Sequence, residues 1–143
     1  MTKFNHLLTP LKIGPKTTRS RVLVSGHQPS MTKNGLPTGQ YVAYQKARAR
    51  GGAGLQITGA TGVHRTGAYA ASHGALVNLD DSIIDGYQRI SDGVHEEGGL
   101  ILAQLTHAGS VISSDKPIPL CGPHPPPKRN LSEKYRTRSP KRS

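Results

Sequence analysis

The sequence contains few of the large apolar residues that fill a protein core. Its 143 residues include no tryptophan, a single phenylalanine and 34% hydrophobic residues. Typical globular chains carry about 45–50% apolar residues, although that figure also counts glycine. The single cysteine, Cys121, excludes an intramolecular disulfide and therefore a disulfide-stabilised scaffold. The length fits one ordinary domain, but the composition predicts a small core.

Long hydrophobic runs are also missing. No stretch approaches the ~20 apolar residues that a helix needs to cross a bilayer. The first thirty residues contain no apolar run of signal-peptide length after a basic start. We therefore expect a cytoplasmic protein without membrane contact. Clustered cysteine ligands are absent from the sequence as well, so no metal site is predicted.

Acidic residues are scarce, and the resulting positive charge is uneven. Residues 1–110 hold eleven basic and six acidic residues, whereas residues 111–143 hold eight basic and only two acidic ones. The second segment also contains seven of the eleven prolines and shows no helical or strand period. It is therefore predicted to be a disordered tail. A solvated tail is the simplest interpretation, and binding to nucleic acid or to an acidic surface is the less favoured alternative.

Residues 1–110 alternate between short apolar runs and helical patterns. Strands are predicted at 21–25, 54–58 and 100–105, because each is a short apolar run next to glycine or polar residues. One helix is predicted from the Thr38 cap to Arg50, with Tyr41 and Tyr44 on one face. A second helix follows the Asp80-Asp81-Ser82 cap and ends at Gly98-Gly99. This order predicts a parallel α/β sheet whose strands are buried on both faces.

The carboxyl ends of parallel strands are where α/β proteins place their chemistry. Small residues occupy two of these ends, with Gly26 after the first strand and Gly59-Ala60 after the second. They would let a flat ligand approach the backbone. Gln104, at the end of the third strand, can both donate and accept hydrogen bonds, which suits the edge of a flavin ring. The alternatives stay open here: turn glycines, and a glutamine bonded to a neighbouring loop.

Three segments give the chain a family resemblance. They are LLTPLKIGPKTTRSRVLVSGH, NGLPTGQYVAYQKARARGGAGLQITGATGVHRTG and DDSIIDGYQRISDGVHEEGGLILAQLTHAG. In this order they resemble the old yellow enzyme family of flavin oxidoreductases, over about residues 7–110. The resemblance implies the N-terminal portion of a (β/α)8 TIM barrel with FMN at the carboxyl ends of its strands. It also implies hydride transfer from NAD(P)H through the flavin to a small substrate, an activated alkene or a related compound.

The same resemblance assigns cofactor contacts residue by residue. Gln104, in the motif QLTHAG, falls on the glutamine that hydrogen-bonds the pyrimidine edge of the flavin. The segment after the first strand and the small residue after the second also fall on flavin contacts. The implied FMN-binding set is Ser25, Gly26, His27, Gln28, Ala60 and Gln104.

The other histidines and their neighbours receive structural interpretations. His107 belongs to the motif but is expected to anchor its loop. His64 and Arg65 are expected in a solvated basic loop. In the alternative interpretation, this loop borders the substrate pocket. His95 is expected at the surface or in helix packing.

The sequence also departs from the family. A TIM barrel has eight βα units, but only three strands and two full helices are predicted here. The catalytic residues of the family have no counterparts in this chain, so they are unknown and the chain alone is expected to be impaired in catalysis. Ser110 stands where the motif normally continues with arginine. The third strand would leave an open sheet edge, at which self-association is expected.

Overall fold

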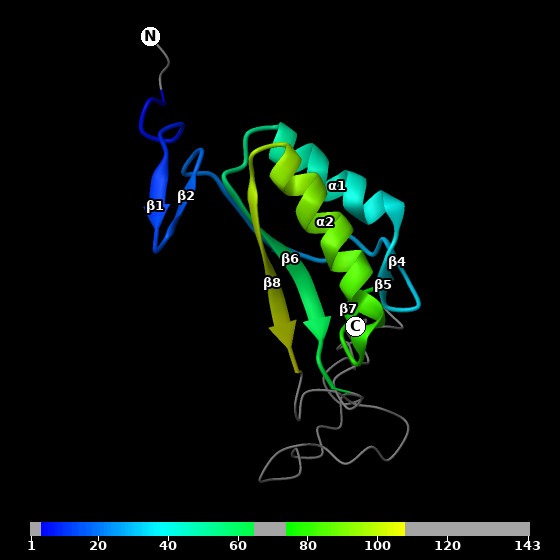
Figure 1. Ribbon diagram of the computed structural model, residues 1–143. Helices are drawn as coiled ribbons and strands as arrows, with labels where there is room; N and C mark the ends of the chain where they lie inside the picture. The colour runs from blue at the N-terminus through cyan, green and yellow to red at the C-terminus, as the bar shows by residue number, and fades with distance from the viewer. Residues whose placement is uncertain (1–3, 65–73, 108–143) are drawn as a thin grey trace, which may run out of the picture.

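A parallel sheet forms the centre of the molecule. The computed structural model describes residues 4–64 and 74–107. The central strand β6 (Leu55–Gly62) pairs with β3 (Leu23–His27) along one edge and with β8 (Leu100–Thr106) along the other, all parallel. A short strand, β7 (Leu76–Val77), pairs with the last two residues of β6 (Figure 1). It lies on the same edge of β6 as β3, which pairs with the first part of that strand.

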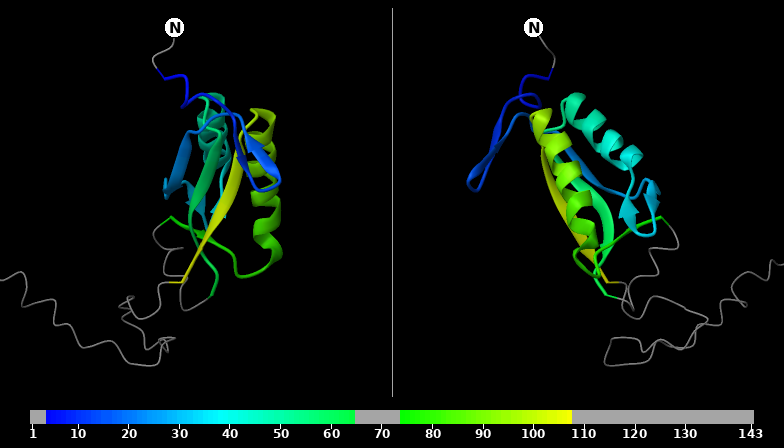
Figure 2. Two further views of the ribbon diagram at one scale, coloured as in Figure 1. Left: turned by 90° about the vertical axis from the view of Figure 1, so that its left-hand side faces the viewer. Right: turned by 45° about the vertical axis from the view of Figure 1, so that its right-hand side comes forward.

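Two helices cover one side of this sheet. Helix α1 (Gly39–Arg50) connects β3 to β6, and α2 (Ile84–Glu96) connects β6 to β8. Figures 1 and 2 show both helices on the same side, as crossovers between parallel strands require. The side of the sheet opposite α1 and α2 is called the open face below. The predicted alternation of strands and helices is therefore confirmed.

The helix caps follow the sequence closely. The Thr38 side chain accepts a hydrogen bond from the backbone N–H of Tyr41 at 3.4 Å, so the predicted cap of α1 is confirmed. Asp80 accepts from the N–H of Ser82 at 2.9 Å and caps a short 3-10 turn, η2 (Asp81–Ile83). Helix α2 begins directly after this turn, one turn later than the aspartates alone would suggest.

Two small hairpins were not predicted. Strands β1 (Leu11–Ile13) and β2 (Lys16–Thr18) pair antiparallel, as do β4 (Thr32–Lys33) and β5 (Leu36–Pro37). The second hairpin turns at Asn34 and Gly35, both with positive φ of 55° and 77°. An Asn-Gly pair is the strongest short-range hairpin signal, so this element could have been found in the sequence.

The core is small and lies between the sheet and the helices. Its central cluster of buried side chains is Tyr41, Leu76, Ile83 and Ile90. The helix-facing side of β6, in contrast, carries the buried polar residues Gln56, Thr58 and Thr61. The sequence predicted a short apolar strand at 54–58. The structure explains the difference: α1 accepts a hydrogen bond from Gln56, α2 donates one to Thr61, and the sheet backbone itself bonds to Thr58.

Charged residues connect the carboxyl ends of the two helices. Arg19 donates hydrogen bonds to the carbonyl oxygen of Ala49, near the end of α1, and to that of Glu97, after α2, the latter at 2.5 Å. Arg50 contacts the Glu97 carboxylate at 2.7 Å, and Lys46 contacts Glu96 at 2.6 Å. A cation at the negative ends of two helix dipoles stabilises both of them.

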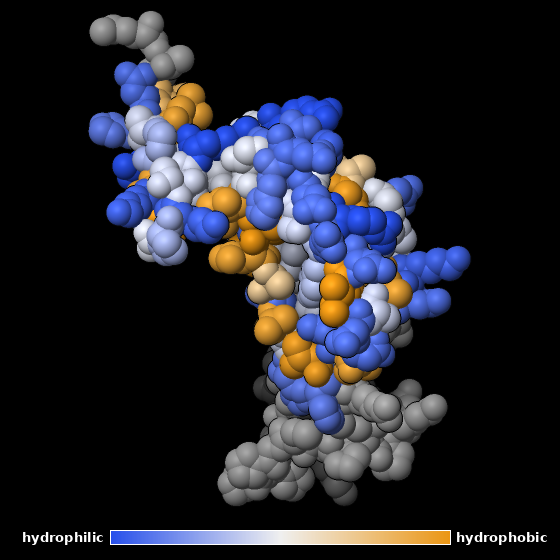
Figure 3. All heavy atoms as spheres, in the orientation of Figure 1, coloured by the Kyte–Doolittle hydropathy of each residue, from blue (hydrophilic) through white to orange (hydrophobic). Residues whose placement is uncertain are grey.

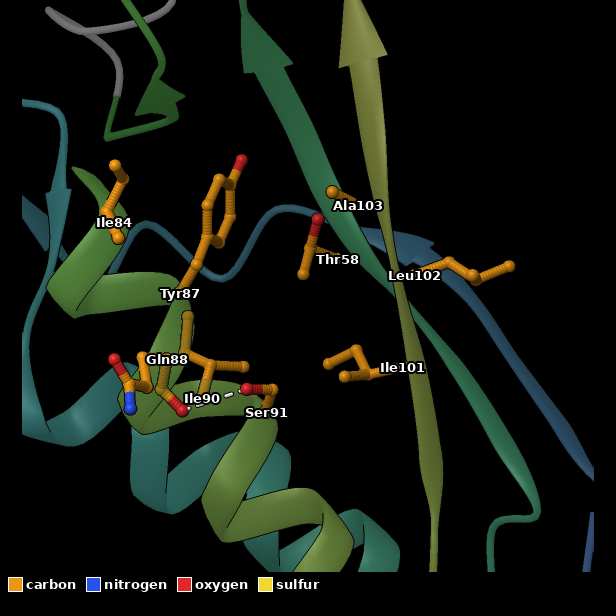
Figure 4. Close-up of a pocket in the computed structure, with 9 residues that line it drawn as sticks. All are labelled: Thr58, Ile84, Tyr87, Gln88, Ile90, Ser91, Ile101, Leu102 and Ala103. Atoms are coloured by element: carbon orange, nitrogen blue, oxygen red, sulfur yellow. Dashed lines mark hydrogen bonds between the residues drawn. The ribbon is translucent and has the colours of Figure 1, made fainter. Parts of the chain in front are cut away.

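Strand β8 departs from the prediction that both strand faces are buried. Leu102 and Leu105 are 56% and 61% exposed, and Figure 3 shows apolar side chains gathered over β8 and beside α2. Within the described part of the chain, no strand pairs with the outer edge of β8. A groove of about 390 Å³ separates α2 from β8, and Figure 4 shows Tyr87, Ile90 and Ile101 along it. The burial prediction is therefore wrong for this strand, and also for β3, in which every residue except Val24 is exposed.

Candidate functional site

Three of the predicted contact residues meet at the carboxyl ends of the strands. Ala60 of β6 is the register partner of Gln104 of β8. Paired residues of neighbouring strands project to the same side of a sheet. Since Gln104 also lies against Gly26 of β3, all three strands contribute to one patch on the open face. We call Gly26, Ala60 and Gln104 the strand-end patch.

The side chain of Gln104 reaches across β6 toward β3. A β-carbon at Gly26 would lie 2.5 Å from Oε1 of Gln104 and 3.1 Å from its Cδ. The carboxamide therefore occupies the space that any larger residue at position 26 would need. Gln104 itself is exposed, so the amide is accessible to a ligand on the open face.

Gly59 permits the close approach of the neighbouring strand. A β-carbon at this position would lie 2.6 Å from the carbonyl oxygen of His27 and 2.9 Å from the Cα of Gln28. The absence of a side chain therefore lets the end of β3 lie directly against β6. The sequence associated Gly59 with ligand approach, whereas the structure also gives it this role between strands.

The His27 ring lies toward the helices. Its ring stacks on that of Tyr44 in α1, with centroids 6.0 Å apart and an angle of 25° between the planes. The Arg48 guanidinium lies 3.3 Å from the centroid of the same tyrosine ring. A contact from His27 to a ligand on the open face would therefore come from its backbone. Ser25 and Gln28, its exposed neighbours, stay predicted contacts.

Two histidines that the sequence treated separately lie close together. The rings of His64, after β6, and His107, after β8, have centroids 5.8 Å apart and are tilted by 48°. His95 is exposed in the last turn of α2, in agreement with its expected surface position. Arg65, Ser110 and the predicted tail 111–143 lie outside the described residues.

Four polar side chains lie behind the strand-end patch, and the sequence assigned none of them a role in the site. The backbone N–H of Gly59 donates to the Tyr41 hydroxyl at 3.3 Å, and that of Gln104 donates to Oγ1 of Thr58, also at 3.3 Å. The Tyr87 hydroxyl donates to Oγ1 of Thr61 at 3.0 Å. Burial raises the pKa of both tyrosines, because the charged phenolate is poorly solvated there. Their hydroxyls are therefore neutral near pH 7.

The strand-end patch has the chemistry of a site for a flat ligand with a polar edge. Glycine at 26 and alanine at 60 keep bulk off the surface, and the Gln104 carboxamide offers both a donor and an acceptor. A flavin ring is flat and has such an edge, so these residues fit FMN. Among residues 4–64 and 74–107, no group of three or more histidine, cysteine or acidic side chains could hold a metal ion. No helix in the same ranges is long and apolar enough to span a bilayer.

Two relatives of this chain are redox enzymes. A metal reductase from Desulforamulus reducens is 37% identical over 108 residues, which are 76% of this chain and 16% of that protein. An N,N-dimethylglycine/sarcosine dehydrogenase from Chromohalobacter salexigens is 36% identical over 107 residues, covering 74% of this chain and 15% of that protein. The chain thus spans less than one fifth of the length of these relatives.

Solved structures show the same local fold. The old yellow enzyme from Trypanosoma cruzi superposes with a TM-score of 0.65 at 30% identity, covering 76% of this chain and 29% of that one. Morphinone reductase in complex with tetrahydroNAD gives a TM-score of 0.65 at 30% identity, covering 73% and 28%. These proteins are TIM barrels, so the described residues form part of such a barrel.

The family match covers nearly the whole chain. It extends over residues 6–139 and so continues past residue 110, where the sequence predicted the end of the barrel portion. This match includes Ser25 to Gln28, Ala60 and Gln104. The chain therefore belongs to the NADH:flavin oxidoreductase / NADH oxidase family, which includes the old yellow enzymes and uses FMN and NAD(P)H as cofactors.

Proposed function

We propose that the strand-end patch binds the ring of FMN and that the chain serves an NAD(P)H-dependent flavin oxidoreductase. The observation that carries this proposal is the contact between Gln104 and Gly26. It directs an exposed carboxamide over a surface that has no side chain larger than a methyl group at positions 26 and 60. Bound FMN would supply the hydride acceptor and donor of the reaction.

Each residue of the patch has a separate role in this proposal. The Gln104 carboxamide orients the ring by hydrogen bonds to its polar edge. Gly26 leaves space for that carboxamide, and Ala60 allows the ring to lie close to the backbone of β6. The backbone of Ser25, His27 and Gln28 borders the same site. A fixed orientation of the reacting ring accounts for much of the rate gain that an enzyme provides.

The substrate and other partners are proposed from the family. NAD(P)H would reduce the flavin, and an activated alkene or a related small molecule would accept the hydride. Similarity to morphinone reductase supports a small-molecule substrate of this kind. We also propose self-association through the outer edge of β8, because exposed Leu102 and Leu105 lie on that strand. Cytoplasmic location and impaired catalysis by this chain alone stay predictions.

Substitution of Gln104 tests the FMN site. The wild-type chain should quench FMN fluorescence in a saturable titration. Gln104→Leu removes the donor and the acceptor at similar volume, so we expect the dissociation constant for FMN to rise by about fivefold to a hundredfold. Gln40→Leu, at an exposed position in the first turn of α1, is the matched control and should bind as the wild type does. Equal affinities of all three chains would contradict the proposal.

A further inference from the structure

Tyr41 connects the helix layer to the strand-end patch. Its side chain is 1% exposed and reaches from the first turn of α1 into the sheet. There its hydroxyl accepts the hydrogen bond from the backbone N–H of Gly59 at 3.3 Å. Gly59 directly precedes Ala60 of the patch. The contact therefore joins a residue behind the sheet to the segment that forms the site in front of it.

Gly59 lies at an irregularity in the strand pairing. The register between β6 and β8 passes from Ile57 opposite Leu102 to Ala60 opposite Gln104. Strand β6 thus advances by three residues while β8 advances by two, so β6 carries one extra residue in a β-bulge. A bulge removes ladder hydrogen bonds and leaves the extra residue unpaired. Buried backbone N–H groups at such a place need other partners.

Two side chains supply those partners. Tyr41 accepts the N–H of Gly59, and Thr58 accepts the N–H of Gln104 at 3.3 Å. The bond from Gly59 to Tyr41 is buried, and the bond from Gln104 to Thr58 is partly buried. Hydrogen bonds that are shielded from water are costly to remove. Tyr41 and Thr58 therefore hold the bulge in its observed shape.

The bulge determines which side chains face the open side. Gln56 donates to the backbone of α1 at Gln45, and Thr61 accepts from Tyr87 of α2, so both residues face the helices. Regular alternation from Gln56 would turn residues 58 and 60 to the helices and residue 61 to the open face. The extra residue reverses this alternation. Ala60 consequently faces the open side beside Gln104.

We propose that Tyr41 is a positioning residue of the flavin site. It acts through the Gly59 N–H, which fixes the bulge that presents Ala60 and Gln104 together. Tyr41 does not contact the ligand, because it lies on the helix side of the sheet. The inference rests on the proposed FMN site, but hydrogen exchange of the Gly59 amide can be measured without FMN.

A pair of tyrosines on the same helix allows a matched experiment. Tyr41→Phe removes the hydroxyl that accepts from Gly59. Tyr44→Phe makes the same chemical change one turn along α1, where the buried hydroxyl has no hydrogen-bond partner among the residues that the structure describes. Thr58→Val provides a second test of the bulge, because it removes the acceptor for the Gln104 N–H at similar volume. It also replaces Tyr41→Phe as the test if that variant does not fold.

Amide hydrogen exchange and FMN titration give the two measurements. In Tyr41→Phe we expect the Gly59 amide to exchange about tenfold faster and the dissociation constant for FMN to rise about fivefold to tenfold. Thr58→Val should weaken FMN binding to a similar extent. Tyr44→Phe should match the wild type in both measurements. This combination of results would support the positioning role.

Other results would overturn it in distinguishable ways. Unchanged FMN affinity in both Tyr41→Phe and Thr58→Val would overturn the positioning role while leaving the FMN site intact. Faster exchange at Gly59 with unchanged FMN affinity would assign the hydrogen bond to stability alone. Failure of the wild-type chain to bind FMN would refute the proposed function itself, and the role of Tyr41 toward a flavin with it.

Discussion

Replacing Gly26 by alanine should displace the Gln104 carboxamide without unfolding the chain. The new β-carbon would lie 2.5 Å from Oε1 of Gln104. Non-bonded atoms prefer a separation of about 3.5 Å, so the oxygen must move by about 1 Å. The nearest obstructing atoms form the far end of a flexible side chain, which can rotate away. The next one, the backbone carbonyl oxygen of Thr58, lies at 3.2 Å and has to yield by only a few tenths of an ångström. We therefore expect the free energy of unfolding to change by less than about 1 kcal/mol.

The same displacement should weaken FMN binding much more. A net hydrogen bond contributes about 0.5–1.5 kcal/mol, and the carboxamide is proposed to make two of them with the ring. Their loss corresponds to about 1–3 kcal/mol. Since 1.4 kcal/mol is a factor of ten, the dissociation constant should rise about fivefold to a hundredfold. The substitution thus separates cofactor binding from folding.

Fluorescence titration of FMN, together with urea unfolding, measures both effects. Gly39→Ala is the control, because a β-carbon at that position meets no atom within 4 Å. We expect Gly26→Ala to bind FMN as weakly as Gln104→Leu while Gly39→Ala binds as the wild type does. The reasoning is refuted if Gly26→Ala keeps wild-type affinity while Gln104→Leu loses it. It is also refuted if Gly26→Ala unfolds the chain.

Two further predictions concern the helix ends. Arg19→Ala removes the hydrogen bonds to the carbonyl oxygens of Ala49 and Glu97. We expect the free energy of unfolding, measured in urea, to fall by about 1–2 kcal/mol. An unchanged urea midpoint would contradict this role of Arg19. The hydrogen bond from Arg50 lowers the pKa of Glu97 in the folded chain. The stabilisation by this bond should therefore be complete above the unfolded pKa of about 4.3 and be lost as the pH falls through the folded pKa. The melting temperature of Glu97→Gln should therefore depend less on pH in this range, and an equal dependence in both chains would contradict the assignment.

Much of the fold could be predicted from the sequence because local signals and tertiary structure agree there. Thr38 caps α1 as expected, and the strand-helix alternation produces the parallel sheet. The prediction was less accurate for β6, which continues to Gly62 rather than ending at residue 58. Gly59, Ala60 and Gly62 look like loop residues because small residues have low strand propensity. Pairing with β8 keeps Ala60 and Gly62 in the strand, and Gly59 stays in it as the extra residue of a bulge.

Part of the site could also be predicted from local sequence. Residue type and motif order were sufficient to select Gly26, Ala60 and Gln104, and the structure brings these three together. The role of Tyr41 could not be predicted, because an apolar helix face is the expected place for a tyrosine ring. Only the observed bulge shows that its hydroxyl replaces a missing ladder bond. The orientation of His27 likewise depends on a stack with Tyr44 that no local pattern indicates.

The central claim is that FMN lies on the open face at the carboxyl ends of β3, β6 and β8. Amide chemical-shift changes in the ¹⁵N spectrum of the wild-type chain during FMN addition test it most directly. The account predicts saturable changes centred on Gly26, Ala60 and Gln104, with small changes along the outer side of α2. Changes centred instead on the groove between α2 and β8, or no saturable change in a folded sample, would contradict it.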